Sequence, residues 1–495
     1  MAELLSGETP GLPAAEDSAP LEAVEVADLS VPVETPAVPD GMVPPPETLP
    51  IFPATRNRDH RWRRFYLAPR FKLLLALIYA FGWTTFSVWI AQGWAADIGA
   101  YLTPVGGWIV VVLIAVLPGF VVGLMTMSLV LDRQPPLKQQ DPVIPVTVII
   151  AAFNEEAGIA ETIQRLAVSD YSGPLPLILA NNGSTDATVE RALAAAAEAG
   201  IELSVVNEPT PGKCFALNTA LATVRTPYVI TVDADTLVHP QAVRRLMSRL
   251  LTGPGHVVAV ASTVLVRNSR VNLLTRMQEW DYWVGIAAVK RMQGMYSSTL
   301  VAQGAFSVYE TAAVREIGGW PDAIGEDIVV TWRIMSEGAR VLFEPTAVAF
   351  TDVPVDLRHF MLQRSRWARG MFEGLRAVPP WRQKSTRAKL MAGVDLLVPF
   401  LDIGYLLLIP GVILWIAGFP LLVSMWTLLV LPVTFLMYGI MRHFQSSRVF
   451  AQLGLRVRKN AFAYVCFLVF YQAICSTSSL IGYLQEVTRQ NRRWK

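Results

Sequence analysis

Five long apolar runs bracket a more polar middle section, and they constrain the fold of this chain more than any other feature. The first two span about 71–91 and 106–131, and three more lie near 391–417, 420–441 and 461–484. A helix of about 20 apolar residues, at ~1.5 Å rise per residue, is long enough to cross a ~30 Å hydrocarbon core. With 53% hydrophobic residues, the chain is also too apolar for an ordinary soluble enzyme. These features predict a membrane protein with two helices before the polar section and about three after it.

The basic residues are distributed unevenly around these runs, which predicts an orientation. Seven of them lie just before or at the start of the first run, whereas the connection at 92–105 contains no lysine or arginine. Short loops rich in lysine and arginine stay on the cytoplasmic side of a membrane. We therefore expect a multi-pass protein of the cell (inner) membrane whose polar middle section is cytoplasmic. The seven residues are Arg56, Arg58, Arg61, Arg63, Arg64, Arg70 and Lys72.

The number of C-terminal crossings is open from the sequence. Three crossings leave the basic C-terminus, with Arg492 and Lys495, on the outer side, which the charge rule disfavours. The run at 391–417 contains two aspartates and two prolines, so a broken or interfacial helix is the alternative. The basic connection at 442–460 favours three full spans, and this is the expectation adopted here.

The N-terminal part is expected to be disordered. Residues 1–50 hold ten acidic side chains and ten prolines but no lysine or arginine, a composition that buries too little apolar surface to fold. The remainder carries 42 basic residues against 30 acidic ones. This excess suits anionic lipid head groups and a diphosphate-bearing substrate, and it is equally common in membrane proteins for reasons of topology. The basic residues cluster at membrane boundaries, which argues against a nucleic-acid binder.

Between about 145 and 350, short β-rich runs alternate with helical stretches, which predicts βαβ units and a mostly parallel sheet. Ligands gather at the carboxyl ends of strands in such sheets. Asn181-Asn182 and Asp233-Ala234-Asp235 both fall at expected strand ends. Their position alone predicts a chemical site. The expected strands are 145–151, 175–180, 201–206 and 228–232, and the expected helices are 155–167, 185–200 and 214–224.

The chain divides into five expected parts. They are a disordered acidic, proline-rich tail (1–55), an N-terminal transmembrane hairpin (56–135), an α/β domain (140–350), interfacial helices (355–380) and C-terminal transmembrane helices (390–485).

Three acidic residues in the α/β domain are candidates for chemistry. Asp233 and Asp235, one residue apart at a strand end, can direct two carboxylates toward one Mg²⁺ or Mn²⁺ ion. A solvated turn is the plainer interpretation of two such aspartates. Asp327 opens a helix whose first amides stabilise a negative charge, so a simple first-turn acid is its alternative.

An amphipathic helix expected at 356–377 carries Gln363, Arg366 and Trp367 among several arginines. Arginine can bind diphosphate oxygens bidentately and stabilise charge on a leaving group. Tryptophan offers a flat apolar face to a sugar ring. A positively charged helix lying on the bilayer, with its tryptophan in the aromatic belt, is compatible with both roles.

Four ordered motifs together resemble those of processive family 2 glycosyltransferases, the group that includes cellulose, chitin, hyaluronan and poly-N-acetylglucosamine synthases. The resemblance covers roughly 145–375 and the flanking membrane helices. It implies an α/β GT-A (Rossmann-like) cytosolic domain fused to a transmembrane helix bundle. The motifs are Gly212-Lys213-x-x-Ala216-Leu217-Asn218, Asp233-x-Asp235, Gly325-Glu326-Asp327 and Gln363-x-x-Arg366-Trp367.

The resemblance also implies site residues. The catalytic residues are Asp327 as general base, Asp235 and Arg366. Asp235 and Asp233 hold the metal, and Trp367, Gly304, Ala305 and Glu326 bind the acceptor. Asn182 stands where the family usually has an aspartate reading the uracil edge, so the identity of the base is less firmly implied. The residues expected to bind the nucleotide sugar are Asn154, Glu156, Asn182, Lys213, Asp233, Gln363 and Arg366.

The function implied is a processive inverting transfer from a nucleotide sugar, with UDP-GlcNAc expected, to a growing β-linked polysaccharide that crosses the lipid bilayer. The compact C-terminus looks most like poly-N-acetylglucosamine synthases, and accessory secretion subunits are expected partners. A cellulose-like β-glucan synthase using UDP-glucose is one alternative. A polyprenyl-phosphate sugar transferase is another, against which the Gln363-x-x-Arg366-Trp367 element argues.

Overall fold

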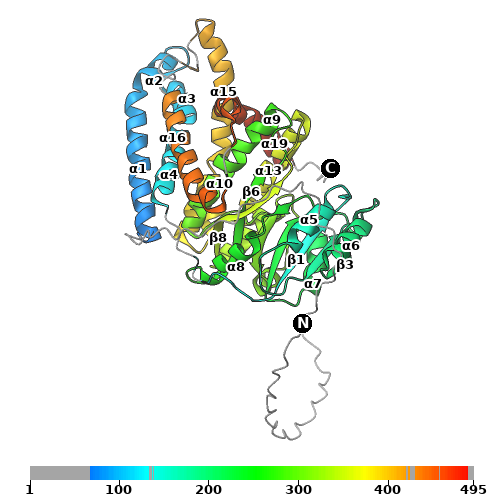
Figure 1. The fold of residues 1–495 in the computed structure, drawn as a ribbon. Helices are drawn as coiled ribbons and strands as arrows, with labels where there is room; N and C mark the ends of the chain where they lie inside the picture. Colours follow the sequence, from blue (N-terminus) through cyan, green and yellow to red (C-terminus); the bar gives the residue numbers. More distant parts are fainter. Residues whose placement is uncertain are drawn as a thin grey trace, which may run out of the picture. The chain divides into compact units, whose positions relative to one another are not determined.

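The computed structural model of the protein describes residues 67–132, 137, 139–419, 422–423, 430–455 and 458–488 (Figure 1). The expected tail at 1–55, the basic residues from Arg56 to Arg64 and the C-terminus beyond residue 488 lie outside the described residues. An α/β domain occupies the middle of the chain, with long helices before and after it.

A single eight-stranded sheet forms the centre of the α/β domain, in the order β3-β2-β1-β4-β7-β6-β8-β5. The four expected strands are confirmed within one or two residues at each end, and they pair in parallel. Beyond β4 the sheet is mixed, because β7 runs antiparallel to both β4 and β6, and β5 antiparallel to β8. The strands are β1 (Val146–Ala152), β2 (Leu177–Asn181), β3 (Leu203–Asn207), β4 (Tyr228–Asp233), β5 (Leu237–Val238), β6 (Val257–Val266), β7 (Phe306–Glu310) and β8 (Arg340–Thr351).

Helices cover both faces of the sheet, which explains why its strands are nearly continuous apolar runs. Successive side chains of a strand point to opposite faces. Val148 and Ile150 of β1 accordingly pack in the core that contains α5, α6 and α8, while Ile149 packs in the core that contains α7, α10 and α12. The helices of this domain are α5 (Ile159–Ala167), α6 (Thr188–Ala199), α7 (Lys213–Thr223), α8 (Ala242–Thr252), α9 (Leu273–Trp280), the π-helical turn η2 (Asp281–Ile286), α10 (Ala287–Met295), α11 (Thr311–Glu316) and α12 (Glu326–Ser336).

The expected helical hairpin before the domain is present. Its helices are α1 (Pro69–Ile90), α2 (Gln92–Gly99), α3 (Pro104–Val111), the π-helical turn η1 (Val112–Val116) and α4 (Leu117–Leu131). α1 packs along α4, and the buried Asp132 just after α4 pairs with Arg291 of α10. The hairpin is therefore attached to the α/β domain by a buried ion pair.

After the domain come α13 (Leu357–Ala377), the short helix η3 (Pro380–Arg382), α14 (Thr386–Asp395), α15 (Val398–Ile416), α16 (Val430–Gln445), η5 (Ser446–Phe450), α17 (Ala451–Leu453), α18 (Ala461–Cys466), η6 (Phe467–Tyr471) and α19 (Gln472–Val487). The helix at 386–416 is interrupted at Leu396 and Leu397, just before Pro399, as its prolines suggested. α16 covers only the later part of the expected run at 420–441, whose beginning lies largely outside the described residues.

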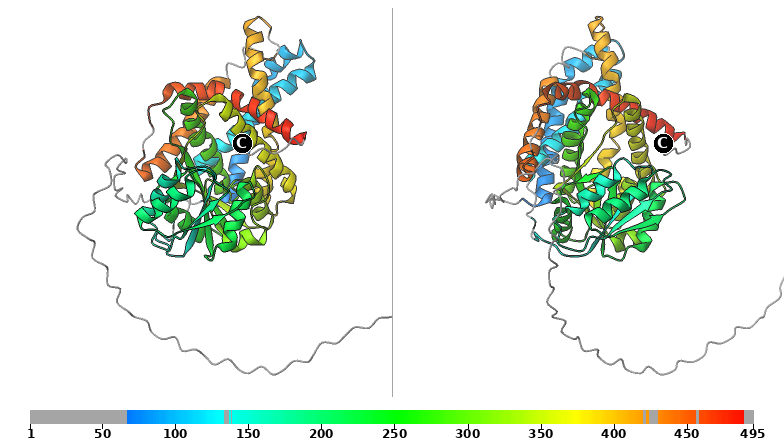
Figure 2. Two further views of the ribbon diagram at one scale, coloured as in Figure 1. Left: turned by 90° about the vertical axis from the view of Figure 1, so that its right-hand side faces the viewer. Right: turned by 45° about the vertical axis from the view of Figure 1, so that its right-hand side comes forward.

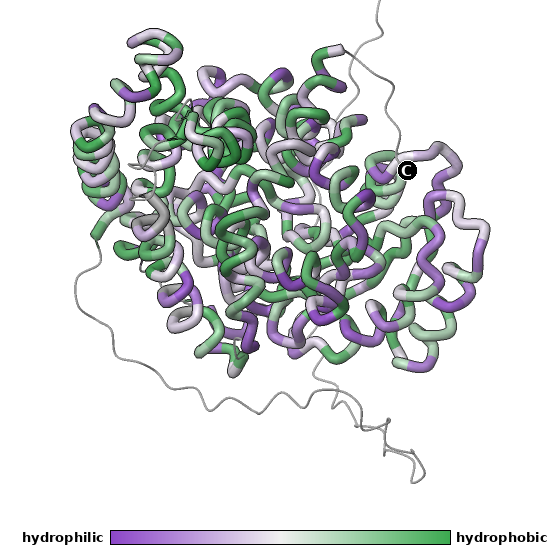
Figure 3. The backbone as a smooth tube through the Cα atoms, turned by 90° about the horizontal axis from the view of Figure 1, so that it is seen from above, coloured by the Kyte–Doolittle hydropathy of each residue, from purple (hydrophilic) through white to green (hydrophobic). Residues whose placement is uncertain are grey.

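Four helices of the described part of the chain are long and apolar enough to cross a membrane, by length and composition. They are Pro69–Ile90, Pro104–Leu131, Thr386–Ile416 and Ala461–Val487. Figure 3 shows long hydrophobic stretches across the molecule, with hydrophilic stretches most frequent on the side of the α/β domain. A membrane protein is thereby supported, with two candidate spans before the domain and two after it among the described residues.

The helix α13 connects the α/β domain to the last candidate span, because it packs along α19 (Figure 2). Its N-terminus is capped by Asp356, whose carboxylate accepts a hydrogen bond from the His359 amide. Glu486 of α19 pairs with Arg369 at 3.5 Å and with Arg376 at 2.8 Å. The expected helix is therefore confirmed, and two of its arginines, Arg364 and Arg369, are buried in ion pairs with neighbouring elements.

Gly482→Ala is expected to destabilise the protein, because an added Cβ on α19 would lie 2.3 Å from the Ser365 carbonyl oxygen of α13. Such overpacking costs roughly 1–3 kcal/mol. Gly393→Ala in α14 is the matched control, since nothing lies within 4 Å of a Cβ added there. Thermal unfolding of the two purified variants in detergent measures the difference. Equal melting temperatures would contradict the close packing of α13 on α19.

Candidate active site

The candidate site is built around the Lys213 ammonium group at the first residue of α7. Nζ donates a short hydrogen bond to Asp233 Oδ1 at the end of β4 and lies 3.8 Å from Glu326 Oε1 at the start of α12. Burial alone would lower the pKa of this lysine, but the charges of Asp233 and Glu326 raise it well above its usual range. Lys213 therefore stays charged and holds acids from two separate elements.

Two glycines make this position of Lys213 possible. Gly212 has a φ of 139°, a backbone conformation that residues other than glycine rarely adopt. It directs the chain into α7. A Cβ on Gly304 would lie 2.7 Å from Lys213 Nζ. The small residue expected to approach the acceptor thus leaves space for the lysine ammonium.

Asp235 is the second acid of the predicted metal pair. Its Oδ2 accepts a hydrogen bond from the Thr351 hydroxyl at 3.3 Å, at the end of β8. Burial and then the charge of Asp233 raise the pKa of Asp235 to about 6. Asp233 and Asp235 are therefore two neighbouring carboxylates with little access to water, and a divalent cation would relieve their repulsion.

Asp327 lies near Lys213, in the first turn of α12. Its Oδ2 accepts the Gly304 amide at 3.4 Å, and Oδ1 accepts the Ile328 amide at 2.8 Å. Burial raises the pKa of Asp327, while the charges of Lys213 and Lys290 act in the opposite direction. Burial likewise raises the pKa of Glu326. Asp327 is thus a desolvated carboxyl whose basicity is adjusted by two lysines.

The start of α12 is pressed directly against α13. A Cβ on Gly325 would lie 2.5 Å from Gly370 Cα, and one on Gly370 would lie 2.8 Å from Gly325 Cα. The Gly325 amide also donates to Glu373 Oε2 at 3.0 Å. The Gly-Glu-Asp motif and the helix of the Gln-x-x-Arg-Trp motif are therefore in backbone contact.

The three motif residues of α13 differ in what their side chains contact. Arg366 is exposed and has no ion pair among the described residues. Gln363 Oε1 is buried without a hydrogen-bond partner in the described part of the chain. Trp367 is 40% exposed, and its ring lies 6.2 Å from that of Tyr282. Arg366 and Trp367 are therefore accessible to a bound molecule.

Arg364 is a contributor that the sequence analysis placed only among the basic residues of this helix. Its guanidinium lies 4.2 Å from the centre of the Trp367 ring, a cation–π geometry. It also pairs with Asp281 of η2 at 3.0 Å and donates to the Tyr471 hydroxyl at 2.9 Å. Asp281 and Tyr471 lie far away in the sequence, so only the fold reveals what holds Arg364 against the Trp367 ring.

The nucleotide-binding residues expected in the first two loops are engaged with backbone groups. Asn154 Oδ1 accepts the Thr185 amide at 2.9 Å, and Glu156 Oε2 accepts the Ala187 amide at 3.1 Å, so both join the loops after β1 and β2. Asn182 donates to the carbonyl oxygens of Glu208 and Thr210 and accepts the Gly212 amide at 2.7 Å.

A carboxylate has no hydrogen to donate, so an aspartate at this position could not make the hydrogen bonds from Asn182 Nδ2 to the Glu208 and Thr210 carbonyl oxygens. The departure from the family pattern at this position therefore has a structural reason, since Asn182 holds the 208–212 loop that leads to Lys213.

Taken together, the structure brings Lys213, Asp233, Gly304, Glu326 and Asp327 into one cluster, with Ala305 bound to it because its carbonyl oxygen accepts the Asp233 amide at 3.2 Å. Asp235 adjoins Asp233. Gln363, Arg366 and Trp367 lie along α13, which touches the cluster through Gly370. The described residues form no group of three or more His, Cys, Asp or Glu that could hold a metal ion. Asp233 and Asp235 would therefore supply two ligands, and substrate phosphates the others.

The sheet and the site define a GT-A α/β fold. A mannosyltransferase from Pyrobaculum calidifontis, solved in complex with GDP-Man and Mn²⁺, superposes with a TM-score of 0.52 at 18% identity. The match covers 78% of this chain and 99% of that protein. At this level of identity the likeness shows the fold, and it confirms the expected GT-A architecture.

The sequence comparisons are more specific. Residues 142–370 match the family described as Glycosyltransferase like family 2, so this segment is a family 2 glycosyltransferase domain, as its motifs suggested. The poly-beta-1,6-N-acetyl-D-glucosamine synthase of Staphylococcus aureus (strain COL) is 30% identical over 246 residues, which are 50% of this chain and 58% of the synthase. The synthase of the same name from Staphylococcus epidermidis is 27% identical over 232 residues, 46% of this chain and 55% of the synthase. The chain thus matches somewhat more than half the length of these relatives.

Lys290→Met is expected to move the acidic limb of the activity profile to higher pH. The Lys290 charge lowers the pKa of Asp327, and without it more of Asp327 is protonated at a given acidic pH. Burial lowers the pKa of Lys290 itself to about 8, so variant and parent should converge above that pH. Sugar transfer measured from pH 5 to 9 tests this, with the exposed Lys389→Met as control. A limb that stays in place or moves to lower pH would refute the influence of Lys290 on Asp327.

Proposed function

We propose that this chain is a processive inverting glycosyltransferase that polymerises a UDP sugar, UDP-GlcNAc, into a β-linked polysaccharide and passes it across the membrane. The observation that carries the proposal is the cluster of Asp233, Asp235, Lys213 and Asp327 in contact with the helix of Arg366 and Trp367. The name shared by the staphylococcal relatives supports the choice of sugar. The four candidate membrane spans on both sides of the domain support transport of the product.

Asp327 acts as the general base in this proposal. It takes the proton from the acceptor hydroxyl as that oxygen attacks the anomeric carbon, and the bond from that carbon to the diphosphate oxygen breaks on the opposite side. The nucleoside diphosphate leaves with the bonding electrons, and the configuration at the anomeric carbon inverts. A carboxyl with a raised pKa suits this task, because its conjugate base accepts a proton more readily near neutral pH.

The leaving group is bound by cations in this proposal. Asp233 and Asp235 would hold Mg²⁺ or Mn²⁺, which neutralises the charge that develops on the diphosphate. The ammonium of Lys213 and the exposed guanidinium of Arg366 add donors to phosphate oxygens. Asn154, Glu156 and Asn182 shape the loops that receive the nucleotide. Gln363, whose buried Oε1 has no hydrogen-bond partner among the described residues, would accept a hydrogen bond from a sugar hydroxyl.

The growing polysaccharide is placed on the Trp367 side of the cluster. Gly304, Ala305 and Glu326 form the wall next to Asp327, and the half-exposed Trp367 ring provides an apolar face on which a sugar can stack and still slide. Arg364 holds that ring through η2 and the last candidate span. Stacking on an exposed ring is suited to a product that moves on after each addition.

The membrane setting completes the proposal. The distribution of basic residues supports a multi-pass protein of the cell (inner) membrane with a cytoplasmic α/β domain. Accessory secretion subunits would receive the polymer on the outer side.

Purified enzyme in lipid nanodiscs, supplied with Mg²⁺ or Mn²⁺, is expected to incorporate label from UDP-GlcNAc into high-molecular-weight glycan, and to do so at least tenfold faster than from UDP-glucose or GDP-mannose. Size-exclusion chromatography of the labelled product measures both rate and length. Label that appears only in a lipid-linked monosaccharide would exclude a processive polymerase. Label incorporated chiefly from UDP-glucose would assign a β-glucan product.

Asp327→Asn is expected to lower turnover by at least about 10²-fold, the contribution typical of a general base, while the affinity for UDP stays within about threefold. The isosteric amide keeps the acceptor for the Gly304 amide but cannot take up a proton. Glu316→Gln, an exposed residue at the end of α11, is the matched control. Isothermal titration with UDP and the polymerisation assay separate the two effects. A parallel loss of binding and turnover would instead assign Asp327 to the fold or to the nucleotide.

A further inference from the structure

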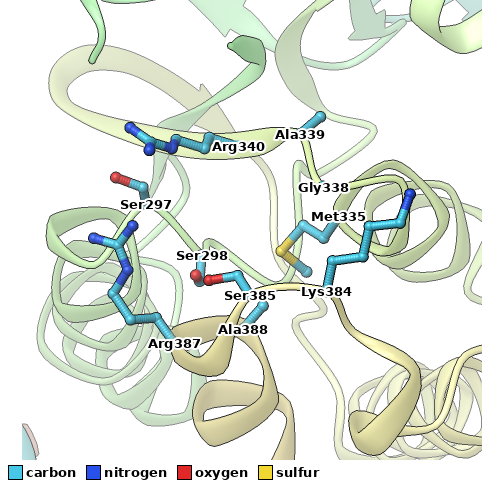
Figure 4. A pocket seen from close by; sticks show the side chains of 10 residues that line it. All are labelled: Ser297, Ser298, Met335, Gly338, Ala339, Arg340, Lys384, Ser385, Arg387 and Ala388. Carbon is cyan, nitrogen blue, oxygen red and sulfur yellow. The ribbon is translucent and has the colours of Figure 1, made fainter. Parts of the chain in front are cut away.

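A cavity of about 250 Å³ lies at the far end of α12 from Asp327 (Figure 4). α12 has 11 residues, so at ~1.5 Å per residue its two ends are about 16 Å apart. None of the motif residues of the candidate active site lines the cavity. It is therefore a separate feature of the domain. Its polar lining consists of Ser297, Ser298, Arg340, Lys384, Ser385 and Arg387.

The lining has three cationic side chains and no carboxylate. Lys384 has a nearby acid, Glu337, at 3.2 Å, but both side chains are about 60% exposed, and such surface pairs are weak. Arg340 donates from one nitrogen to the Pro254 carbonyl oxygen, which does not neutralise its charge. Arg387 has no ion pair among the described residues. Burial and then the charge of Arg340 lower the pKa of Arg387, which agrees with a crowding of like charges.

Ser297 provides an independent indication of a ligand. In the described part of the chain, Ser297 is one of two residues other than glycine with a positive φ, which is 56°. Residues other than glycine rarely adopt this backbone conformation. Only 8% of Ser297 is exposed, and its hydroxyl has no hydrogen-bond partner among the described residues. Figure 4 shows this hydroxyl on the side of the cavity where the guanidinium groups of Arg340 and Arg387 lie. A hydroxyl beside two guanidinium groups is a donor set for phosphate oxygens.

The cavity also adjoins the start of a candidate membrane span. Ser385 is the N-cap residue of α14, and its side chain makes no capping hydrogen bond. The first amides of α14 and its helix dipole therefore favour an anion at this point. α14 is itself polar and is followed, after the interruption at Leu396 and Leu397, by α15, which carries the apolar part of the candidate span Thr386–Ile416. The cavity therefore lies on the polar side of that span. Basic pockets at this level of a membrane protein fit the head groups of anionic lipids.

We propose that this cavity is a binding site for a phosphate group, contributed by the head group of an anionic phospholipid or by a small soluble phosphate. Arg387 and Arg340 bind the phosphate oxygens, and Ser297 and the start of α14 donate the remaining hydrogen bonds. The position beside Thr386 favours the lipid as the source. The volume accommodates a phosphate with a few attached carbons, below the ~300–1,000 Å³ of sites for drug-sized ligands.

The test uses the delipidated full-length protein and a binding readout that requires no sugar transfer, so it is independent of the proposed function. Phosphatidylglycerol, phosphatidylcholine and inorganic phosphate are titrated separately, and bound ligand is counted by native mass spectrometry. Arg387→Gln is compared with Arg382→Gln, which removes an exposed arginine from η3 just before α14 and outside the cavity. Melting temperatures of both variants confirm that they are folded.

Arg387→Gln is expected to weaken phosphatidylglycerol binding about tenfold, the usual effect of losing one charge-assisted hydrogen bond, while Arg382→Gln leaves it unchanged. Phosphatidylcholine, with no net charge, is expected to bind more weakly. If inorganic phosphate shows the same dependence on Arg387 and phosphatidylglycerol does not, the site stands and its ligand is soluble. If both variants weaken binding equally, or Arg387→Gln changes neither ligand, the site does not exist. Arg387→Lys, which keeps the charge, covers the case in which the glutamine variant does not fold.

Discussion

The arrangement of the site depends on the ion pairs made by the Lys213 ammonium group. It lies among the carboxyl groups of Asp233, Glu326 and Asp327, which belong to β4 and α12. Without this charge, three carboxyl groups in a poorly hydrated space would repel one another and take up protons. One lysine therefore determines where the end of β4 and the start of α12 can meet. The absence of a side chain at Gly304 follows from the same requirement, since the ammonium occupies that volume.

The first half of the sheet and the acidic site could be predicted because their signals are local. Short β-rich runs of five to seven residues define β1 to β4, and Asp233 and Asp235 lie at the end of the last of them. The mixed second half could not, since the pairing of β7 with β4 and β6 depends on contacts between distant segments. The partners of Asn182 were equally hidden. Its amide binds backbone groups of the 208–212 loop, which a motif comparison does not represent.

The basic face of α13 shows how one sequence pattern can serve two purposes. Its arginines were expected at a bilayer surface, but Arg364 and Arg369 are buried in ion pairs with Asp281 and Glu486. Removing one partner of a buried pair leaves an uncompensated charge, which costs more than the pair itself contributes. The arginines therefore fix the register of α13 against η2 and α19. Composition alone cannot distinguish a charged face that meets water from one that meets acids on a neighbouring helix.

The backbone contact between Gly325 and Gly370 has a mechanical consequence. Side chains between two helices usually accommodate small shifts of one helix by changing rotamer. Gly325 and Gly370 have no side chains to do so, because their backbones are in direct contact. A displacement of α13 is thus carried to the first turn of α12, and Asp327 moves with it. If Trp367 stacks a glycan and Asp327 accepts the proton, as proposed above, the close approach of Gly325 and Gly370 would link the position of the glycan mechanically to the position of the base.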